Sequence, residues 1–240
     1  MNHDKPLVAI MGPTASGKTA LALELAREFG GEIICADSRT IYKGMNIGAA
    51  KPTKKERKLV PHHMLDLIEP GEKYTIYRFK EEVLRLIEEI RQRGHIPFLV
   101  GGSGLYLYTI LFDYDFEQKK RRQELIENCI AVGIEIDKET LQQRISQRAG
   151  EMLKAGLEKE VKKLVKKYGS DCPQLNRNAY GEVQKYLRGE INRGELRARI
   201  ETVDWQLAKK QNTWFTQKHD KITWLPLDNA KKYIFDLLSE

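Results

Sequence analysis

Eight residues near the start of the chain have the composition and spacing of a phosphate-binding loop. They read Gly12-Pro-Thr-Ala-Ser-Gly-Lys-Thr19 and fit G-x-x-x-x-G-K-[ST], between a short apolar run and a helical pattern. Glycines let the backbone curl until its N–H groups face one anion, and the helix N-terminus adds a favourable dipole. Lys18 would neutralise phosphate charge, and the Thr19 hydroxyl would hold Mg²⁺. The residues predicted to bind a di- or triphosphate are Gly12, Thr14, Ala15, Ser16, Gly17, Lys18 and Thr19.

Two further polar segments follow apolar runs that are typical of buried strands. Asp37 comes directly after Ile33–Ala36, and Gly101-Gly-Ser-Gly104 comes directly after Ile96–Val100. Asp37 could bind Mg²⁺, accept a proton or cap a turn, and its spacing alone leaves these roles open. The glycine segment is either a tight strand-to-helix turn or a place of close ligand approach, with Ser103 directed into the site.

Two arginines and two histidines are further candidates for chemistry. Arg144 and Arg148 lie about one helical turn apart on one face, and a guanidinium fork can grip phosphate oxygens with two hydrogen bonds. The alternative is a pair of surface arginines over a packed apolar face. His62 and His63 precede Asp66, a set that could suggest a metal. Because adjacent histidines point apart on most backbones, we expect hydrogen-bonding or structural roles for them.

The elements that must position these residues alternate along the first half of the chain. The expected strands are Leu7–Met11, Ile33–Ala36, Met64–Ile68, Ile96–Val100, Ile130–Ile136 and Ile222–Leu225. The expected helices are Thr19–Phe29, Phe79–Arg93, Leu141–Arg148, Met152–Tyr168, Glu182–Arg188, Glu195–Lys218 and Asn229–Leu238, with a break near Gly150. Short buried strands alternating with helices predict an α/β fold, a P-loop NTPase-like doubly wound parallel sheet with ligands at the carboxyl ends of its strands. We expect one domain over residues 1–240, with a reduced accessory segment around 112–129 and a helical C-terminal part over 137–219.

Composition limits the class of protein. Hydrophobic residues make up 41% of the 240 residues, enough for a core, and the net charge of +7 suits a polyanionic partner. The three cysteines are far apart and outside any CxxC pattern, which indicates reduced thiols rather than disulfides or a zinc site. No apolar run approaches the roughly 18 residues of a membrane span, and the N-terminus does not resemble a signal peptide. We expect a cytoplasmic monomer without a membrane partner.

Seven segments together resemble the tRNA dimethylallyltransferase family, and they occur in that family's order over most of the chain. They are Gly12–Thr19, Asp37-Ser-Arg-Thr-Ile-Tyr42, Gly48-Ala-Ala-Lys-Pro52, His62-His-Met-Leu-Asp66, Pro97–Tyr106, Arg144–Val161 and Ala208-Lys-Lys-Gln-Asn-Thr-Trp-Phe215. The resemblance implies transfer of a dimethylallyl group from dimethylallyl diphosphate to N6 of the adenosine next to the anticodon in tRNA.

The resemblance also implies roles for individual residues. The P-loop, with Arg144 and Arg148, would hold the diphosphate of the donor, and Lys18, Thr19 and Mg²⁺ would stabilise the leaving charge. Asp37 would be the general base that takes the N6 proton. The residues expected to contact the tRNA anticodon loop are Asp37, Ser38, Arg39, Thr40, Ser103 and Arg122.

The sequence departs from the family pattern at several positions. Thr40 stands where the family usually has glutamine, and Ala179-Tyr-Gly-Glu182 replaces Gly-Tyr-x-Glu. Asp204-Trp205 stands where Thr-Arg is expected, which removes a diphosphate-binding arginine unless Arg177 replaces it.

The stretch between Tyr106 and Ile130 is short, whereas the family usually has a helical insertion here that grips the anticodon stem. Lys119-Lys-Arg-Arg122 is a candidate remnant of it. Three alternatives follow from these departures: the same transfer to free AMP, ADP or ATP, a P-loop small-molecule kinase, or a non-catalytic RNA-binding relative. The short insertion favours the first, the Arg144/Arg148 pair the second, and the changes at Thr40 and Trp205 the third.

Overall fold

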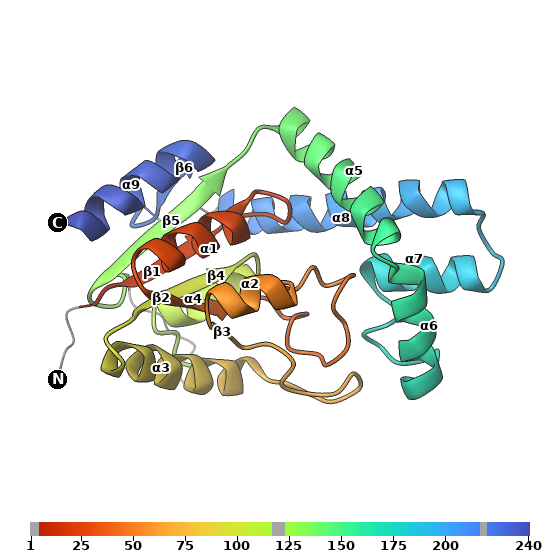
Figure 1. The fold of residues 1–240 in the computed structure, drawn as a ribbon, viewed down its shortest axis with the longest axis horizontal. Coiled ribbons are helices and arrows are strands. Elements are labelled where there is room, and N and C mark those ends of the chain that lie inside the picture. Colours follow the sequence, from red (N-terminus) through yellow and green to blue (C-terminus); the bar gives the residue numbers. More distant parts are fainter. Residues whose placement is uncertain (1–4, 117–122, 217–219) are drawn as a thin grey trace.

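The structure is a computed structural model that describes residues 5–116, 123–216 and 220–240 (Figure 1). Arg122 and the rest of the basic segment 119–122 lie outside the described residues. The strands are β1 (Leu7–Met11), β2 (Gly31–Cys35), β3 (His62–His63), β4 (Ile96–Gly101), β5 (Cys129–Glu135) and β6 (Thr223–Pro226). The helices are α1 (Lys18–Glu28), α2 (Lys54–Leu59), α3 (Ile76–Gln92), α4 (Gly104–Leu111), α5 (Lys138–Lys154), α6 (Leu157–Tyr168), α7 (Asn178–Leu187), α8 (Arg193–Thr216) and α9 (Leu227–Ser239).

The strands form one parallel sheet in the order β3-β2-β4-β1-β5-β6. All residues of β1, β2 and β4 are buried, as expected for parallel strands covered on both faces. From β1 through β2 to β3, successive strands are added toward one edge of the sheet. From β3 onward, β4, β5 and β6 lie progressively toward the opposite edge. Since such crossovers are right-handed, helices must cover both faces. The predicted doubly wound α/β fold is therefore confirmed.

Contacts between the helices agree with this arrangement. Helix α1 packs on α9, while α3 packs on α4 and α4 on α8 (Figure 1). Helices α5 to α8 extend beyond the sheet and share a second apolar core, which includes Met152, Leu157, Val161 and Tyr180, and which Met45 from the loop after β2 also joins. Among the described residues, no helix is long and apolar enough to cross a membrane.

Two predictions of secondary structure are wrong and one helix was not predicted, each for a local reason. The strand predicted at Met64–Ile68 is wrong, because Met64 and Asp66 have positive φ angles of 61° and 55° that interrupt an extended chain. The pairing strand is His62–His63, and Ile68 makes only an isolated bridge to Tyr42.

The helix break expected near Gly150 lies instead at Gly156, whose φ of 96° ends the run while α5 continues through Gly150. Helix α2 was not predicted. It begins with a capping box in which Thr53 and Glu56 exchange hydrogen bonds, a pattern that the sequence T-x-x-E carries.

One buried carboxylate joins the edge strand to the rest of the sheet. Glu32 on β2 is 3% exposed and accepts hydrogen bonds from Arg93 at 2.8 Å, His95 at 2.7 Å and His63 at 2.6 Å. Burial raises the pKa of Glu32, but these three donors outweigh it and hold the pKa at about 2. His63 is thus a partner of Glu32, and His62 bonds to the Val60 carbonyl at 2.8 Å. The expected hydrogen-bonding role of both histidines is confirmed.

The Glu32 cluster gives a prediction for stability. The folded-state pKa lies below the usual value near 4.5, so the ionised carboxylate stabilises the fold fully above that pH and loses its effect as the pH falls toward 2. Glu32→Gln should lower the free energy of unfolding at pH 7 by about 2 kcal/mol. The difference in free energy of unfolding between wild type and variant, measured by urea unfolding, should become smaller as the pH falls below 4.5.

The control is Glu81→Gln, which changes an exposed carboxylate of α3 and should have little effect at any pH. If Glu32→Gln lowers the free energy of unfolding equally at pH 7 and pH 3.5, the ionised Glu32 carboxylate is not what stabilises the fold.

Candidate functional site

The predicted phosphate-binding loop connects β1 to α1 at the carboxyl edge of the sheet. Gly17 adopts a φ of 94°, and a Cβ there would approach Leu227 to 2.9 Å, so both backbone and space require glycine. Helix α1 begins at Lys18, and the Lys18 ammonium donates to the Pro13 carbonyl at 2.9 Å. The ammonium therefore lies folded over the loop, next to the N-terminus of the helix.

The environment of Lys18 depresses its basicity. Burial lowers the pKa of Lys18 to about 8, with Asp37 acting in the opposite direction and Arg148 and Arg39 adding to the lowering. An ammonium that lies half-buried among other cations gains more from a bound anion than an exposed one does. This electrostatic imbalance is typical of a binding site rather than of a structural lysine.

Both predicted arginines reach the loop. Arg144 donates to the Ser16 carbonyl at 3.0 Å, and Arg148 donates to the Thr14 hydroxyl. Arg148 also lies 3.6 Å from the carboxylate of Asp204, which is 1% exposed. The buried Asp204 carboxylate thus pairs with the Arg148 guanidinium.

A cavity of about 800 Å³ opens over this loop, and we call it the P-loop cavity. The expected diphosphate-binding residues that line it are Thr14, Ala15, Gly17, Lys18, Thr19, Arg144 and Arg148. Gly12 and Ser16 belong to the same loop, but they are buried and do not line this cavity. The Thr19 hydroxyl and the Asp37 carboxylate border the same cavity, and oxygen donors of these types suit Mg²⁺.

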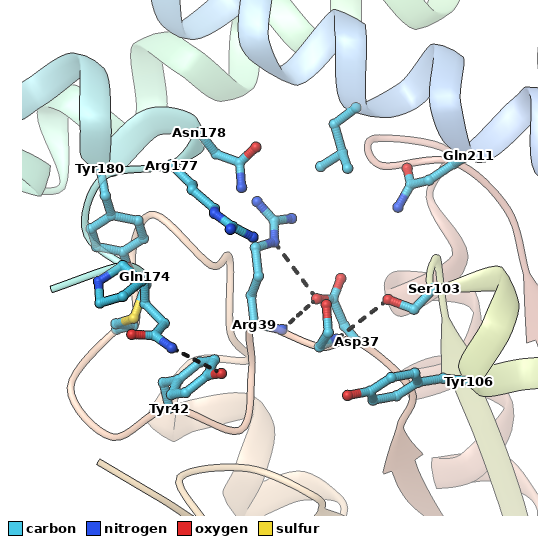
Figure 2. Close-up of a pocket in the computed structure, with 14 residues that line it drawn as sticks. Asp37, Arg39, Tyr42, Ser103, Tyr106, Gln174, Arg177, Asn178, Tyr180 and Gln211 are labelled. Atoms are coloured by element: carbon cyan, nitrogen blue, oxygen red, sulfur yellow. Dashed lines mark hydrogen bonds and ion pairs between the residues drawn. The ribbon is translucent and has the colours of Figure 1, made fainter. Parts of the chain in front are cut away.

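A second cavity of about 350 Å³ lies next to the first, and we call it the tyrosine cavity (Figure 2). Its walls are three tyrosines, Tyr42, Tyr106 and Tyr180, together with polar residues from the segment before α7. Three aromatic side chains in one cavity suit a stacked, planar ligand, and the polar side chains beside them can hydrogen-bond to its edge. Of the residues expected to contact tRNA, those that line it are Asp37, Ser38, Arg39 and Ser103.

Asp37, Arg39 and Gln211 line both cavities. The Asp37 carboxylate accepts the backbone N–H of Arg39 at 2.9 Å, and the Arg39 guanidinium lies 3.6 Å from it (Figure 2). Ser38 donates its N–H to the Ser103 hydroxyl at 3.3 Å, which joins the ends of β2 and β4. Asp37 is thus fixed between the two cavities.

Two expected site residues lie elsewhere than their roles suggest. Thr40 borders the P-loop cavity and donates its hydroxyl to the Asp37 carbonyl at 3.0 Å, so it supports the turn and does not line the tyrosine cavity. Arg177 lines the tyrosine cavity and not the P-loop cavity, whereas a residue that replaces the expected diphosphate-binding arginine would be expected at the P-loop cavity. Trp205 packs against the cluster of Leu141 and Ile145.

Sequence reasoning missed several lining residues of the tyrosine cavity and the position of Gln211. The Gln211 side-chain oxygen accepts the backbone N–H of Thr14 at 2.7 Å, although the two residues are 197 positions apart. Gln211 is 9% exposed and belongs to the segment Ala208–Phe215, which carried the resemblance without an assigned role. The other lining residues without an earlier role are Tyr42, Met45, Tyr106, Pro173, Gln174, Asn178, Tyr180 and Leu207.

Comparison with known proteins identifies the chain's relatives. The family model described as IPP transferase matches residues 40–130 and 115–218. The tRNA dimethylallyltransferase of Bacillus subtilis (strain 168) is 31% identical over 306 residues, which cover 98% of this chain and 97% of the relative. The chain belongs to the tRNA dimethylallyltransferase family. The enzyme of the same name from Staphylococcus saprophyticus is 32% identical and covers 100% of this chain and 97% of the relative.

Solved structures of family members have the same fold. The full-length tRNA isopentenylpyrophosphate transferase from Bacillus halodurans superposes with a TM-score of 0.86 at 27% identity, covering 98% of this chain and 96% of the other. The Bacillus subtilis match extends over 306 residues whereas this chain has 240, so that relative of the dimethylallyltransferase family carries residues without a counterpart here. The two family-model segments meet at residues 115–130, within the short stretch after Tyr106.

The depressed pKa of Lys18 leads to a prediction for ligand binding. Since a bound diphosphate favours the ammonium form, binding above pH 8 must take up one proton. The affinity for dimethylallyl diphosphate, measured by calorimetry at constant Mg²⁺, should be level just below pH 8 and fall by about tenfold per pH unit above it. Lys18→Ala should bind more weakly and show no such fall, and an equally steep fall in that variant would assign the titration to another group.

The hydrogen bond between Gln211 and Thr14 gives a second prediction. Gln211→Ala leaves a buried N–H of the P-loop without its acceptor, so the affinity for dimethylallyl diphosphate should fall by about tenfold. Gln206→Ala, an exposed position of the same helix, is the matched control and should bind as wild type does. Equal affinities for both variants would show that the loop keeps its shape without Gln211.

Proposed function

We propose that this protein transfers the dimethylallyl group of dimethylallyl diphosphate to N6 of the adenosine next to the anticodon in tRNA. Membership in the tRNA dimethylallyltransferase family supports this reaction. The observation that carries the assignment of roles is the position of Asp37, which borders both the P-loop cavity and the tyrosine cavity. A base in that position can act on an acceptor in one cavity while the donor occupies the other.

The P-loop cavity would hold the donor by its diphosphate. The N–H groups at the start of α1, together with Lys18, Arg144 and Arg148, supply the positive charge and the hydrogen-bond donors that a leaving diphosphate needs. A magnesium ion held by the Thr19 hydroxyl and the phosphate oxygens would neutralise further negative charge. The kinase alternative lacks support among the relatives named above, which are dimethylallyltransferases.

The tyrosine cavity would hold the acceptor adenine. The base stacks among Tyr42, Tyr106 and Tyr180, with its amino group directed to Asp37. N6 attacks the allylic carbon, the bond from that carbon to the diphosphate oxygen breaks, and the N6 proton passes to the Asp37 carboxylate. The products are the prenylated adenosine and free diphosphate, and Asp37 must release its proton before the next cycle.

The proposal extends to the setting of the enzyme. We propose a cytoplasmic monomer, and the cytoplasmic location is consistent with the three free cysteines, of which Cys35 and Cys172 are buried. Reduced thiols of this kind are typical of proteins outside oxidising compartments.

The reaction is tested with purified protein, Mg²⁺ and labelled dimethylallyl diphosphate. Unmodified tRNA is offered as acceptor, with AMP, ADP and ATP in separate reactions. We expect label in tRNA alone. Label in the mononucleotides alone would replace tRNA by free adenylates as the substrate, and label in neither would leave a protein without this activity.

Asp37→Ala tests the base. Turnover should fall by a factor of about 10² or more, because the N6 proton loses its acceptor, while the affinity for dimethylallyl diphosphate changes little. The control, Glu24→Ala, removes an exposed carboxylate at the rim of the P-loop cavity and should keep its turnover. An unchanged rate for Asp37→Ala excludes Asp37 as the base.

A further inference from the structure

A third cavity, of about 560 Å³, lies between α6 and the loop after β2, on the far side of that loop from the tyrosine cavity. Lys159, Lys163 and Lys167 follow one another at intervals of four residues and line one wall, and Lys43 from the loop lines the other. All four side chains are exposed at its edge. We call this cavity the lysine groove.

The positive charge of the lysine groove is only partly balanced. Two carboxylates line it, against four lysines. Glu69 lies 3.2 Å from Lys167 and 3.6 Å from Lys43, and it also accepts a hydrogen bond from Tyr168. Within the described part of the chain, Lys159 and Lys163 have no carboxylate within 4 Å. Because like charges four residues apart on a helix repel each other, an anion in the groove would relieve this repulsion.

The other carboxylate holds the groove in shape and does not neutralise its lysines directly. Glu160 accepts the backbone N–H of Ile47 at 3.0 Å and that of Gly48 at 3.3 Å. It also accepts the hydroxyl of Tyr180 at 2.8 Å. Glu160 therefore ties α6 to the loop and to a wall of the tyrosine cavity, so the lysine groove and the tyrosine cavity are built on the same contacts.

The lysine groove and the tyrosine cavity are lined by the same segments of the chain. Within the loop, Tyr42 and Met45 line the tyrosine cavity, whereas Lys43 and its neighbours line the lysine groove. Tyr168 at the end of α6 borders the groove, and Gln174 after that helix borders the tyrosine cavity. Gln174 donates to the Tyr42 hydroxyl at 3.3 Å (Figure 2). A nucleic acid with one base in the tyrosine cavity would have neighbouring phosphates within reach of the lysine groove.

We propose that the lysine groove binds the phosphate backbone of the RNA whose adenosine enters the tyrosine cavity. The inference rests on the proposed function, since it takes that RNA to be the acceptor. Lysines with flexible stems suit such binding, because the positions of phosphates along a loop vary and only their charge is shared. The groove would thereby add affinity for RNA without reading its sequence.

The experiment compares two double variants of α6. Lys159→Ala with Lys163→Ala removes two lysines of the groove, and Lys162→Ala with Lys166→Ala removes two exposed lysines of the same helix that do not line it. The probe is an unmodified tRNA transcript with an adenosine next to its anticodon. Its dissociation constant is measured by fluorescence anisotropy over a series of salt concentrations.

We expect the groove variant to bind the transcript about tenfold more weakly at moderate salt, with the slope of log Kd against log salt reduced by roughly 1.5, the loss of two phosphate contacts. The control variant should change neither value appreciably. Both double variants should bind dimethylallyl diphosphate with the affinity of wild type, which would show that both are folded. Equal effects of the two double variants, no effect of either, or a wild type that does not bind the transcript would each overturn the proposal.

This test is independent of turnover. If wild type binds the transcript but transfers no dimethylallyl group to it, the proposed function fails while the comparison of the two variants still decides the role of the groove. If transfer to tRNA proceeds and the groove variant binds as wild type does, only the groove proposal fails.

Discussion

The alignment of parallel strands at one edge of the sheet is the constraint on which the rest of the structure depends. Strand β4 lies between β1 and β2, with Met11 beside Gly101 and Cys35 beside Val100. Their carboxyl ends deliver the P-loop, Asp37 and Ser103 to one place. The strands are buried on both faces, so no residue can slip in register without losing core contacts. The site is thus positioned by the interior of the protein rather than by its loops.

Charge is concentrated above this edge, and the fold tolerates it through partial pairing. Lys18 lies half-buried beside Arg148 and Arg39, and burial is the largest cause of the lowering of its pKa. Asp37 moderates that effect, while Asp204 lies against Arg148. The positive charge that these carboxylates do not balance is available to a ligand. Burying unpaired cations costs free energy, and a bound anion would offset that cost. The unbalanced positive charge therefore lowers the stability of the fold at the edge of the sheet where the proposed donor binds.

The helical C-terminal part supplies residues that complete the cavities at the edge of the sheet. Gln211 of α8 reaches the P-loop backbone, and the segment before α7 supplies one side of the tyrosine cavity. Glu160 of α6 holds the loop that carries Tyr42 and Lys43. One set of contacts therefore supports the P-loop cavity, the tyrosine cavity and the lysine groove. A change in the packing of α5 to α8 would be expected to act on all three together.

The sequence by itself determined the features that are encoded in contiguous residues. The P-loop, the buried strands and the family could be predicted because glycines at constrained positions and unbroken apolar runs act locally. The strand at Met64–Ile68 and the break at Gly150 were predicted wrongly, because backbone angles at Met64, Asp66 and Gly156 decided those boundaries. Only the tertiary structure brought Gln211 to Thr14, Thr40 to the P-loop cavity and Arg177 to the tyrosine cavity. Such pairings join segments far apart in the chain, and they follow from how helices pack, which no local pattern records.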